Sequence, residues 1–114
     1  MHELSVTESV LEITLRHAQQ AGAKRVTHLY LVIGQLASII DDSVQFYWDI
    51  VSKDTLAEGA TLHFRRVPVE LKCLECNQTY HPQQSDFACP HCNSTQIKII
   101  SGEEFFIEAI DIDQ

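Results

Sequence analysis

The stretch that decides the fold is CLECNQTYHPQQSDFACPHC, residues 73–92, which holds every cysteine of the chain. The cysteines form two C-x2-C pairs, Cys73 with Cys76 and Cys89 with Cys92. Two thiolates at this spacing bind one ion from a single tight turn, and two facing turns complete a tetrahedral site. An Asn follows each pair, and Asn tolerates the left-handed backbone that such a turn needs. The pattern predicts a structural Zn(II) site, because four thiolates leave no coordination position open.

Two other uses of four cysteines stay open at this point. One is iron in a rubredoxin-like site, and the other is a pair of disulfides, for which three pairings are possible. The chain starts without a basic stretch followed by an apolar core, so a cytoplasmic location is expected, where disulfides are disfavoured. His81 and His91 lie beside the cysteines and could replace a thiolate.

The segment around the cysteines, residues 70–98, contains little that is aliphatic between Leu74 and Ile97. It is not expected to build an apolar core of its own, so bound metal would supply its folding free energy. We interpret residues 70–98 as a zinc-binding domain inserted before the last strand. Residues 1–69 and 99–114 then form the remaining α/β domain.

Hydrophobic periodicity predicts two helices outside this insert. The first covers residues 5–21, with Ser5 and Glu8 as a capping box, Gly22 as the C-cap and residues 1–4 as an exposed lead-in. The second begins at Asp41 or Asp42. Its apolar stripe is expected to be widened by two further side chains, Phe46 and Ile50.

Three strands are expected beside the helices, over residues 26–33, 61–67 and 104–110. The predicted fold class is therefore α+β, a small three-stranded sheet with two helices plus an inserted zinc-ribbon-like domain.

The charge and composition exclude several function classes. The chain has 114 residues and a formal net charge of −8, whereas wrapping nucleic acid needs an excess of Lys and Arg. The longest apolar run, residues 29–33, is far shorter than the ~20 residues of a membrane span. The sequence also lacks a Gly-rich phosphate loop and an evident nucleophile–base arrangement, so an enzyme is not expected.

The first three residues, Met1, His2 and Glu3, offer nitrogen ligands close together. The amine of Met1, the backbone nitrogen and imidazole of His2, and the backbone nitrogen of Glu3 could close adjacent chelate rings. Nitrogen-rich planar coordination suits Ni(II) or Cu(II). By chemistry alone, an incidental histidine is the favoured interpretation.

Taken together, these motifs resemble the HypA/HybF family of hydrogenase nickel-incorporation proteins over essentially the whole chain. The resemblance is carried by the opening Met1-His2-Glu3 before an amphipathic helix, by the Asp-capped second helix, and by the twin cysteine pairs. Three further short motifs occur in the same order as in the family: Ile33-Gly34, Glu58-Gly59-Ala60 and Gly102-Glu103-Glu104.

The resemblance implies a nickel metallochaperone that binds Ni(II) through His2, the Met1 amine and the Glu3 backbone. It implies Zn(II) bound by the four cysteines, and Asp41 near the nickel. The implied partners are the GTPase HypB and the large subunit of [NiFe]-hydrogenase, with neither a nucleic acid nor a membrane. A monomer and a homodimer both stay open, and so does the alternative of a zinc-ribbon interaction adaptor without a nickel role.

Overall fold

The computed structural model describes residues 3–39, 41–82 and 86–114 of the chain. Contacts divide it into two compact units. The first comprises residues 1–32, 38–65 and 106–114, and the second comprises residues 33–37 and 66–105.

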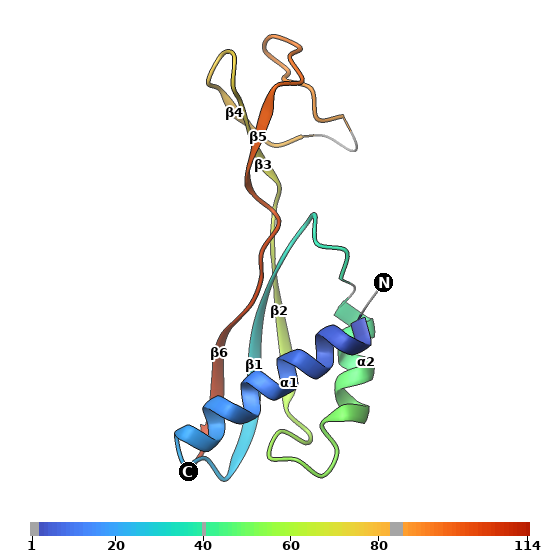
Figure 1. Ribbon diagram of the computed structural model, residues 1–114, viewed down its shortest axis with the longest axis vertical. Coiled ribbons are helices and arrows are strands. Elements are labelled where there is room, and N and C mark those ends of the chain that lie inside the picture. Colours follow the sequence, from blue (N-terminus) through green and yellow to red (C-terminus); the bar gives the residue numbers. More distant parts are fainter. Residues whose placement is uncertain (1–2, 40, 83–85) are drawn as a thin grey trace. The chain divides into compact units, whose positions relative to one another are not determined.

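The first unit contains both helices and most of one sheet (Figure 1). Its helices are α1 (Glu3–Gln20) and α2 (Asp41–Val51), and its sheet consists of β1 (Arg25–Gly34), β2 (Thr61–Val67) and β6 (Phe105–Asp113). The strand order is β2-β1-β6, so β2 and β6 share a sheet although the cysteine pairs lie between them in sequence. The α+β class with a three-stranded sheet and two helices is confirmed. The last strand runs three residues further than the predicted end at Ile110.

Helix α1 begins at Glu3, so the predicted lead-in is wrong for residues 3 and 4, and so is the capping box at Ser5. Residues 1 and 2 of that lead-in lie outside the described residues. The side chain of Glu3 is buried, whereas Leu4 and Ser5 in the same turn are exposed. The other end is as predicted. Gly22 has a φ of 68°, and the N–H of Ala23 donates to the carbonyl of Ala18 at 2.9 Å, which closes the helix with a left-handed cap.

The apolar residues of α1 form a broad arc around the helix, and the buried stripe is narrower than this arc. At its centre lie Thr7 and Thr14 beside Val10 and Ala18. Thr7 tolerates burial because its hydroxyl donates to the carbonyl of Glu3. Apolar residues at the edges of the arc, such as Ile13, are exposed instead.

Helix α2 begins at Asp41, one of the two predicted caps, and contacts α1. Val44 and Trp48 are completely buried, one turn apart. Phe46 and Ile50 are 60% and 57% exposed, so the expectation that they widen the packed stripe is wrong. The reason is angular, because Phe46 projects about 200° around the helix from Val44.

Replacing Phe46 by serine is therefore expected to change the free energy of unfolding by no more than about 0.5 kcal/mol. Thermal or urea unfolding measures this. Val44→Ala is the matched control on the buried face and should destabilise clearly more. Equal losses for the two variants would contradict the orientation of α2.

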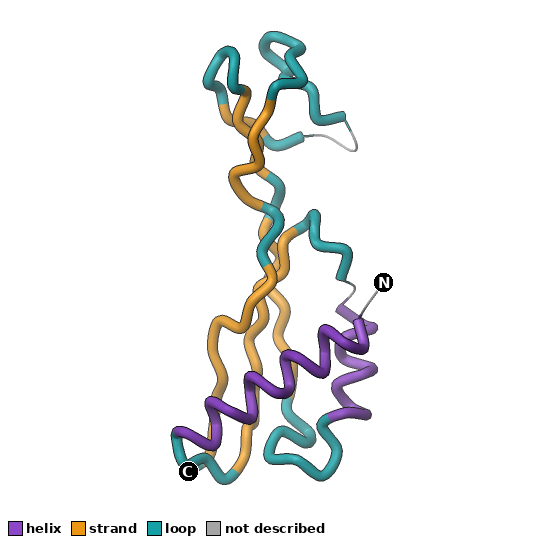
Figure 2. Tube along the Cα trace, viewed as in Figure 1, coloured by secondary structure: helices purple, strands orange, loops and turns teal. Residues whose placement is uncertain are grey.

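The second unit is built around a sheet of three short strands, β3 (Glu70–Cys73), β4 (Thr79–Tyr80) and β5 (Ile97–Ser101), in the order β4-β3-β5. Both pairings are antiparallel, and Leu71 lies opposite Tyr80 and Ile99. Figure 2 shows the loops that extend from the ends of these strands.

This unit contains a small core, contrary to the expectation of none. Val69, Leu71 and Tyr80 are buried together with Cys73 and Cys89, and Phe87 packs against them. Two of the five buried residues are thus predicted metal ligands. A core this small is not expected to stay folded without the four-cysteine site. The domain limits of 70–98 stay a prediction.

Candidate metal centre

The first cysteine turn follows β3 directly. The N–H of Cys76 points at the sulfur of Cys73 at 3.5 Å, and the N–H of Asn77 donates to the carbonyl of Cys73 at 2.9 Å. Asn77 has a φ of 63°, the left-handed conformation predicted for this position. The turn therefore places both sulfurs on one side of a single backbone loop.

The second turn repeats this geometry. The N–H of Asn93 donates to the carbonyl of Cys89 at 2.8 Å, and Asn93 has a φ of 62°. The N–H of His91 points at the sulfur of Cys89 at 3.4 Å. Backbone N–H groups directed at sulfur favour the thiolate form, which is the form that binds metal.

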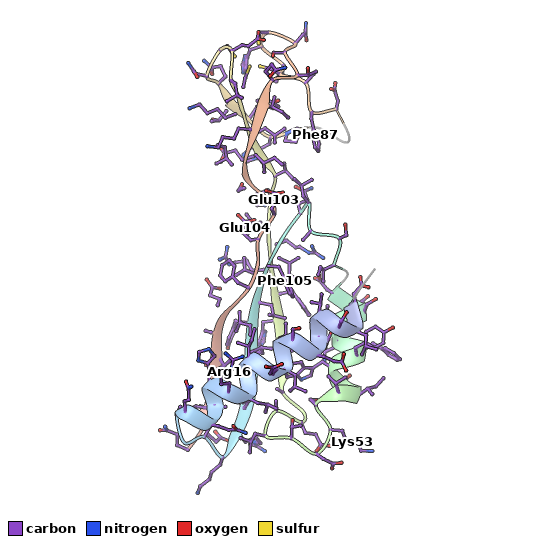
Figure 3. The ribbon with its side chains drawn as sticks, viewed as in Figure 1. Arg16, Lys53, Phe87, Glu103, Glu104 and Phe105 are labelled. Atoms are coloured by element: carbon purple, nitrogen blue, oxygen red, sulfur yellow. The ribbon has the colours of Figure 1, made fainter. Side chains whose placement is uncertain are left out.

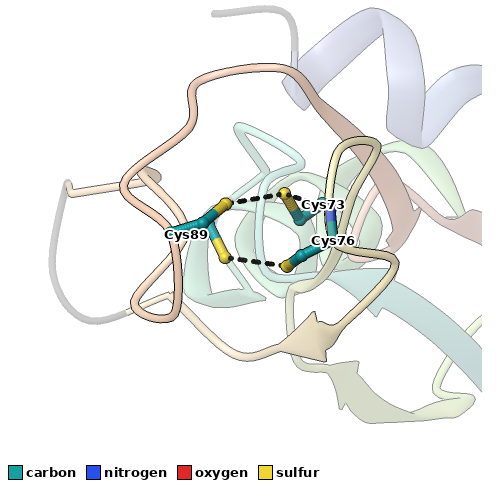
Figure 4. Close-up of side chains that lie close together, drawn as sticks. Cys73, Cys76 and Cys89 are labelled. Atoms are coloured by element: carbon teal, nitrogen blue, oxygen red, sulfur yellow. Dashed lines mark hydrogen bonds between the residues drawn. The ribbon is translucent and has the colours of Figure 1, made fainter.

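The four sulfur atoms converge on one point. All lie within 4.8 Å of one another, and the Cys73–Cys92 and Cys76–Cys89 sulfur distances are 3.5 and 3.6 Å. Figure 4 shows the sulfurs of Cys73, Cys76 and Cys89 turned toward each other. A tetrahedral ion with Zn–S bonds near 2.3 Å requires sulfur separations of about 3.8 Å.

The donor set therefore fits a structural zinc ion. All four thiols are free, and the separations are far longer than the roughly 2.05 Å of a disulfide bond. Four sulfur ligands suit a closed tetrahedral site with no position for a substrate. Among residues 3–39, 41–82 and 86–114, this is the one cluster of three or more side chains that could hold a metal ion.

The acidities of the thiols are unequal. The backbone N–H of Cys76 is the main cause that lowers the pKa of Cys73, to about 7. The backbone N–H of Ser94 lowers the pKa of Cys92, but hydrogen bonding with Cys73 and burial outweigh it and raise that pKa to about 12. Adjacent thiolates repel one another, and a bound divalent metal would offset half of the charge of four thiolates.

Aromatic and imidazole groups surround the cluster without joining it. The Tyr80 hydroxyl donates to the carbonyl of Phe87, which is labelled in Figure 3. Burial raises the pKa of this phenol. The Nδ1 of His81 lies 2.8 Å from the carbonyl of Val69, and His91 is exposed. Neither histidine belongs to the four-ligand cluster. That His81 or His91 could replace a thiolate stays a prediction.

The predicted nickel ligands are only partly described. Met1 and His2 lie outside the described residues. Glu3 is buried, and its Oε2 has no hydrogen-bond partner within the described part of the chain. Asp41 is half-buried at the start of α2.

His28 and His63 lie on two different strands, and the structure brings them together. Their ring nitrogens lie 2.9 Å apart on neighbouring strands. A sequence signal for this pair is weak, because strand pairing and register cannot be deduced from two single histidines.

A small α+β fold with a four-cysteine cluster defines a class of metal-binding proteins with a zinc-ribbon-like module. Among known proteins, residues 1–112 match the family model described as "Hydrogenase/urease nickel incorporation, metallochaperone, hypA". The chain thus belongs to the HypA/HybF family of hydrogenase maturation nickel metallochaperones.

Relatives and solved structures agree with this membership. The chain is 42% identical to hydrogenase maturation factor HypA of Dehalococcoides mccartyi over 113 residues, which cover 99% of this chain and 95% of that protein. It is 34% identical to hydrogenase maturation factor HybF of Salmonella typhimurium, over 99% of this chain and 100% of the relative. The solution structure of the Ni metallochaperone HypA from Helicobacter pylori has the same fold, with a TM-score of 0.69 at 23% identity, covering 99% of this chain and 98% of the other.

The family description names a metallochaperone, and the relative is named a maturation factor. None of the helices that the structure describes is long and apolar enough to cross a membrane.

Proposed function

We propose that this chain binds Ni(II) at its amino terminus and delivers it to the large subunit of a [NiFe]-hydrogenase during maturation. The ligands are the Met1 amine, the His2 imidazole and backbone nitrogen, and the Glu3 backbone nitrogen. In the same proposal, Zn(II) is bound by the four cysteines within residues 70–98. Residues 1–69 and 99–114 form the nickel-binding domain.

One structural observation supports this ligand set: α1 begins at Glu3. The first N–H groups of a helix have no acceptor one turn earlier in the chain. The Glu3 nitrogen can therefore bind a metal without breaking a hydrogen bond of α1. A chelate at this position leaves the helix intact when nickel arrives and when it leaves.

Delivery requires a site that releases its cargo. An amine, backbone nitrogens and one imidazole at a chain end can detach one after another, whereas the closed thiolate site cannot exchange a ligand so readily. The amine and the imidazole bind only when deprotonated, and their ordinary pKa values are about 7.7–8.0 and 6.5. Nickel binding is therefore expected to weaken on acidification. We place the GTPase HypB as the partner of this step.

Replacing His2 by alanine is expected to weaken Ni(II) binding at the amino terminus about 100-fold or more, equivalent to about 2.7 kcal/mol, because the imidazole closes a chelate ring. Equilibrium dialysis with Ni(II) on the untagged, zinc-loaded chain measures the loss. Acetylating the amino terminus should have a comparable effect.

His17→Ala is the matched control, because His17 is an exposed histidine near the other end of α1. This variant should bind nickel normally, and all variants should retain their zinc and helix content. Undiminished nickel affinity in His2→Ala would contradict the assignment. In that case the zinc-ribbon adaptor without a nickel role would gain support.

A further inference from the structure

A pair of histidines lies outside both the four-cysteine site and the proposed amino-terminal nickel site. His28 lies on β1 and His63 on β2, which are neighbours in the sheet. The Nδ1 of His28 is 2.9 Å from the Nε2 of His63, and their ring centroids are 5.1 Å apart. Two imidazole nitrogens are thus held side by side by the backbone of one sheet.

The pair is accessible to solvent. Leu29, Leu31 and Ile33 are buried, whereas His28 and Tyr30 alternate with them along β1 and are only half-buried. Alternation along a strand places the two sets on opposite faces. His63 is exposed, so water and small ions can reach both imidazoles.

The orientation of His63 is supported by its neighbours. The ring of Tyr30 stacks on His63 with centroids 4.7 Å apart and planes 12° from parallel. The Tyr30 hydroxyl in turn donates to the Asp111 carboxylate at 2.8 Å. This hydrogen bond raises the pKa of the Tyr30 phenol, so the phenol stays protonated and acts as support. Such outer groups are what fixes the direction of histidine ligands at metal sites.

The local charge permits a cation to approach. Two of the three arginines on these strands are paired with a carboxylate, Arg25 with Asp113 at 2.9 Å and Arg65 with Glu108 at 3.1 Å. The third, Arg66, donates to the carbonyl of Gly34 at 3.3 Å. The positive charge of Arg25 and Arg65 is therefore compensated, and the chain as a whole carries −8.

From this geometry we propose that His28 and His63 form a third metal site, which binds one late first-row divalent ion such as Ni(II), with water as the remaining ligands. Imidazole nitrogen is a preferred ligand of these ions. Two nitrogens on one ion, at bond lengths near 2.0–2.1 Å, lie about 2.9–3.4 Å apart. The observed separation is already within this range.

Binding exchanges a hydrogen bond for two metal–nitrogen bonds. In the metal-free pair, one imidazole N–H donates to the lone pair of the other ring. On binding, the donor ring shifts its proton to its other nitrogen, and small rotations of both rings direct their lone pairs to one point. With two protein ligands, this site is weaker and exchanges its ion faster than the amino-terminal chelate.

The test uses the full zinc-loaded chain with His2→Ala, which removes the amino-terminal chelate. Equilibrium dialysis with Ni(II) should still detect about one weakly bound equivalent. Adding His63→Gln or His28→Gln should weaken it at least about tenfold, because even outer-shell changes typically cost metal sites 10–100-fold. Adding His17→Gln, the matched exposed control, should change nothing.

Paramagnetic broadening locates the ion independently of affinity. Ni(II) added to His2→Ala should broaden the NMR signals of His28 and His63 before those of His17. Equal binding by the variants with and without His63→Gln, or broadening elsewhere, would overturn the proposal. Failure of the amino-terminal assignment would be seen separately, as undiminished tight binding in His2→Ala while His63→Gln still removes the weak equivalent.

Discussion

Removing zinc from the purified chain is expected to unfold residues 70–98 while α1, α2 and the β2-β1-β6 sheet stay folded. Cys73 and Cys89 are buried members of a five-residue core, so the metal ligands make up much of what holds this segment together. Structural zinc contributes about 10–16 kcal/mol of apparent binding free energy in small zinc modules, most of which is folding free energy. Zinc removal is therefore the change with the largest expected effect on this protein.

Hydrogen exchange of the chain with and without a chelator measures this effect. Amides of residues 70–98 should lose protection, and those of α1 should keep it. Cys76→Ser should reproduce the loss and release zinc. His91→Ala, at an exposed position next to Cys92, is the control and should do neither. If metal analysis shows that zinc is absent and residues 70–98 still keep their protection, the prediction is contradicted.

Acidification should release the same zinc without a chelator. The metal binds thiolates, and the pKa of Cys92 is raised to about 12 in the metal-free cluster, so protons compete with zinc throughout the physiological range. Zinc affinity therefore rises with pH and falls as the thiolates are protonated.

The second large effect is expected from Gly34→Ala, with a loss of about 3 kcal/mol in the free energy of unfolding, the upper end of the usual cost of overpacking. A Cβ atom at this position would lie 2.1 Å from the carbonyl oxygen of Gly102 and 2.6 Å from the backbone nitrogen of Glu103, a residue labelled in Figure 3. Both neighbours are backbone atoms, which cannot rotate away as a side chain would. The N–H of Gly34 also donates to the carbonyl of Glu104 at 2.6 Å, which fixes this close approach.

Urea unfolding compares Gly34→Ala with Gly59→Ala, the matched control. Gly59 has a φ of 79° but open space around it, so its variant should lose only the roughly 1–2 kcal/mol of a left-handed backbone. If Gly34→Ala were as stable as the natural chain, the close contact between Gly34 and Gly102 would be refuted.

The zinc module was predictable in detail because its chemistry is local. The spacing within each C-x2-C pair, and an Asn directly after it, predict a knuckle turn from adjacent residues alone. The positive φ values at Asn77 and Asn93 confirm the turn geometry. Helix ends with a strong local signal were equally predictable, as Asp41 and Gly22 show.

Other features were mispredicted or missed where two surfaces had to meet. The apolar character of Phe46 indicates burial, but which side of α2 is covered depends on what packs against it. Glu3 is polar and near the chain start, so nothing in its neighbours predicts that it is buried in the first turn of α1.

The sequence by itself determined the four-cysteine motif, the two helices and the three strands of the first sheet, because turn spacing and hydrophobic periodicity act over a few residues. Only the tertiary structure decided that His28 meets His63, that Gly34 touches Gly102, and that Phe46 faces solvent. The two contacts join residues far apart in the chain and depend on strand pairing, and the exposure of Phe46 depends on the rotation of α2. Packing of the whole unit selects the strand pairing and the helix rotation, and neither can be deduced from single residues.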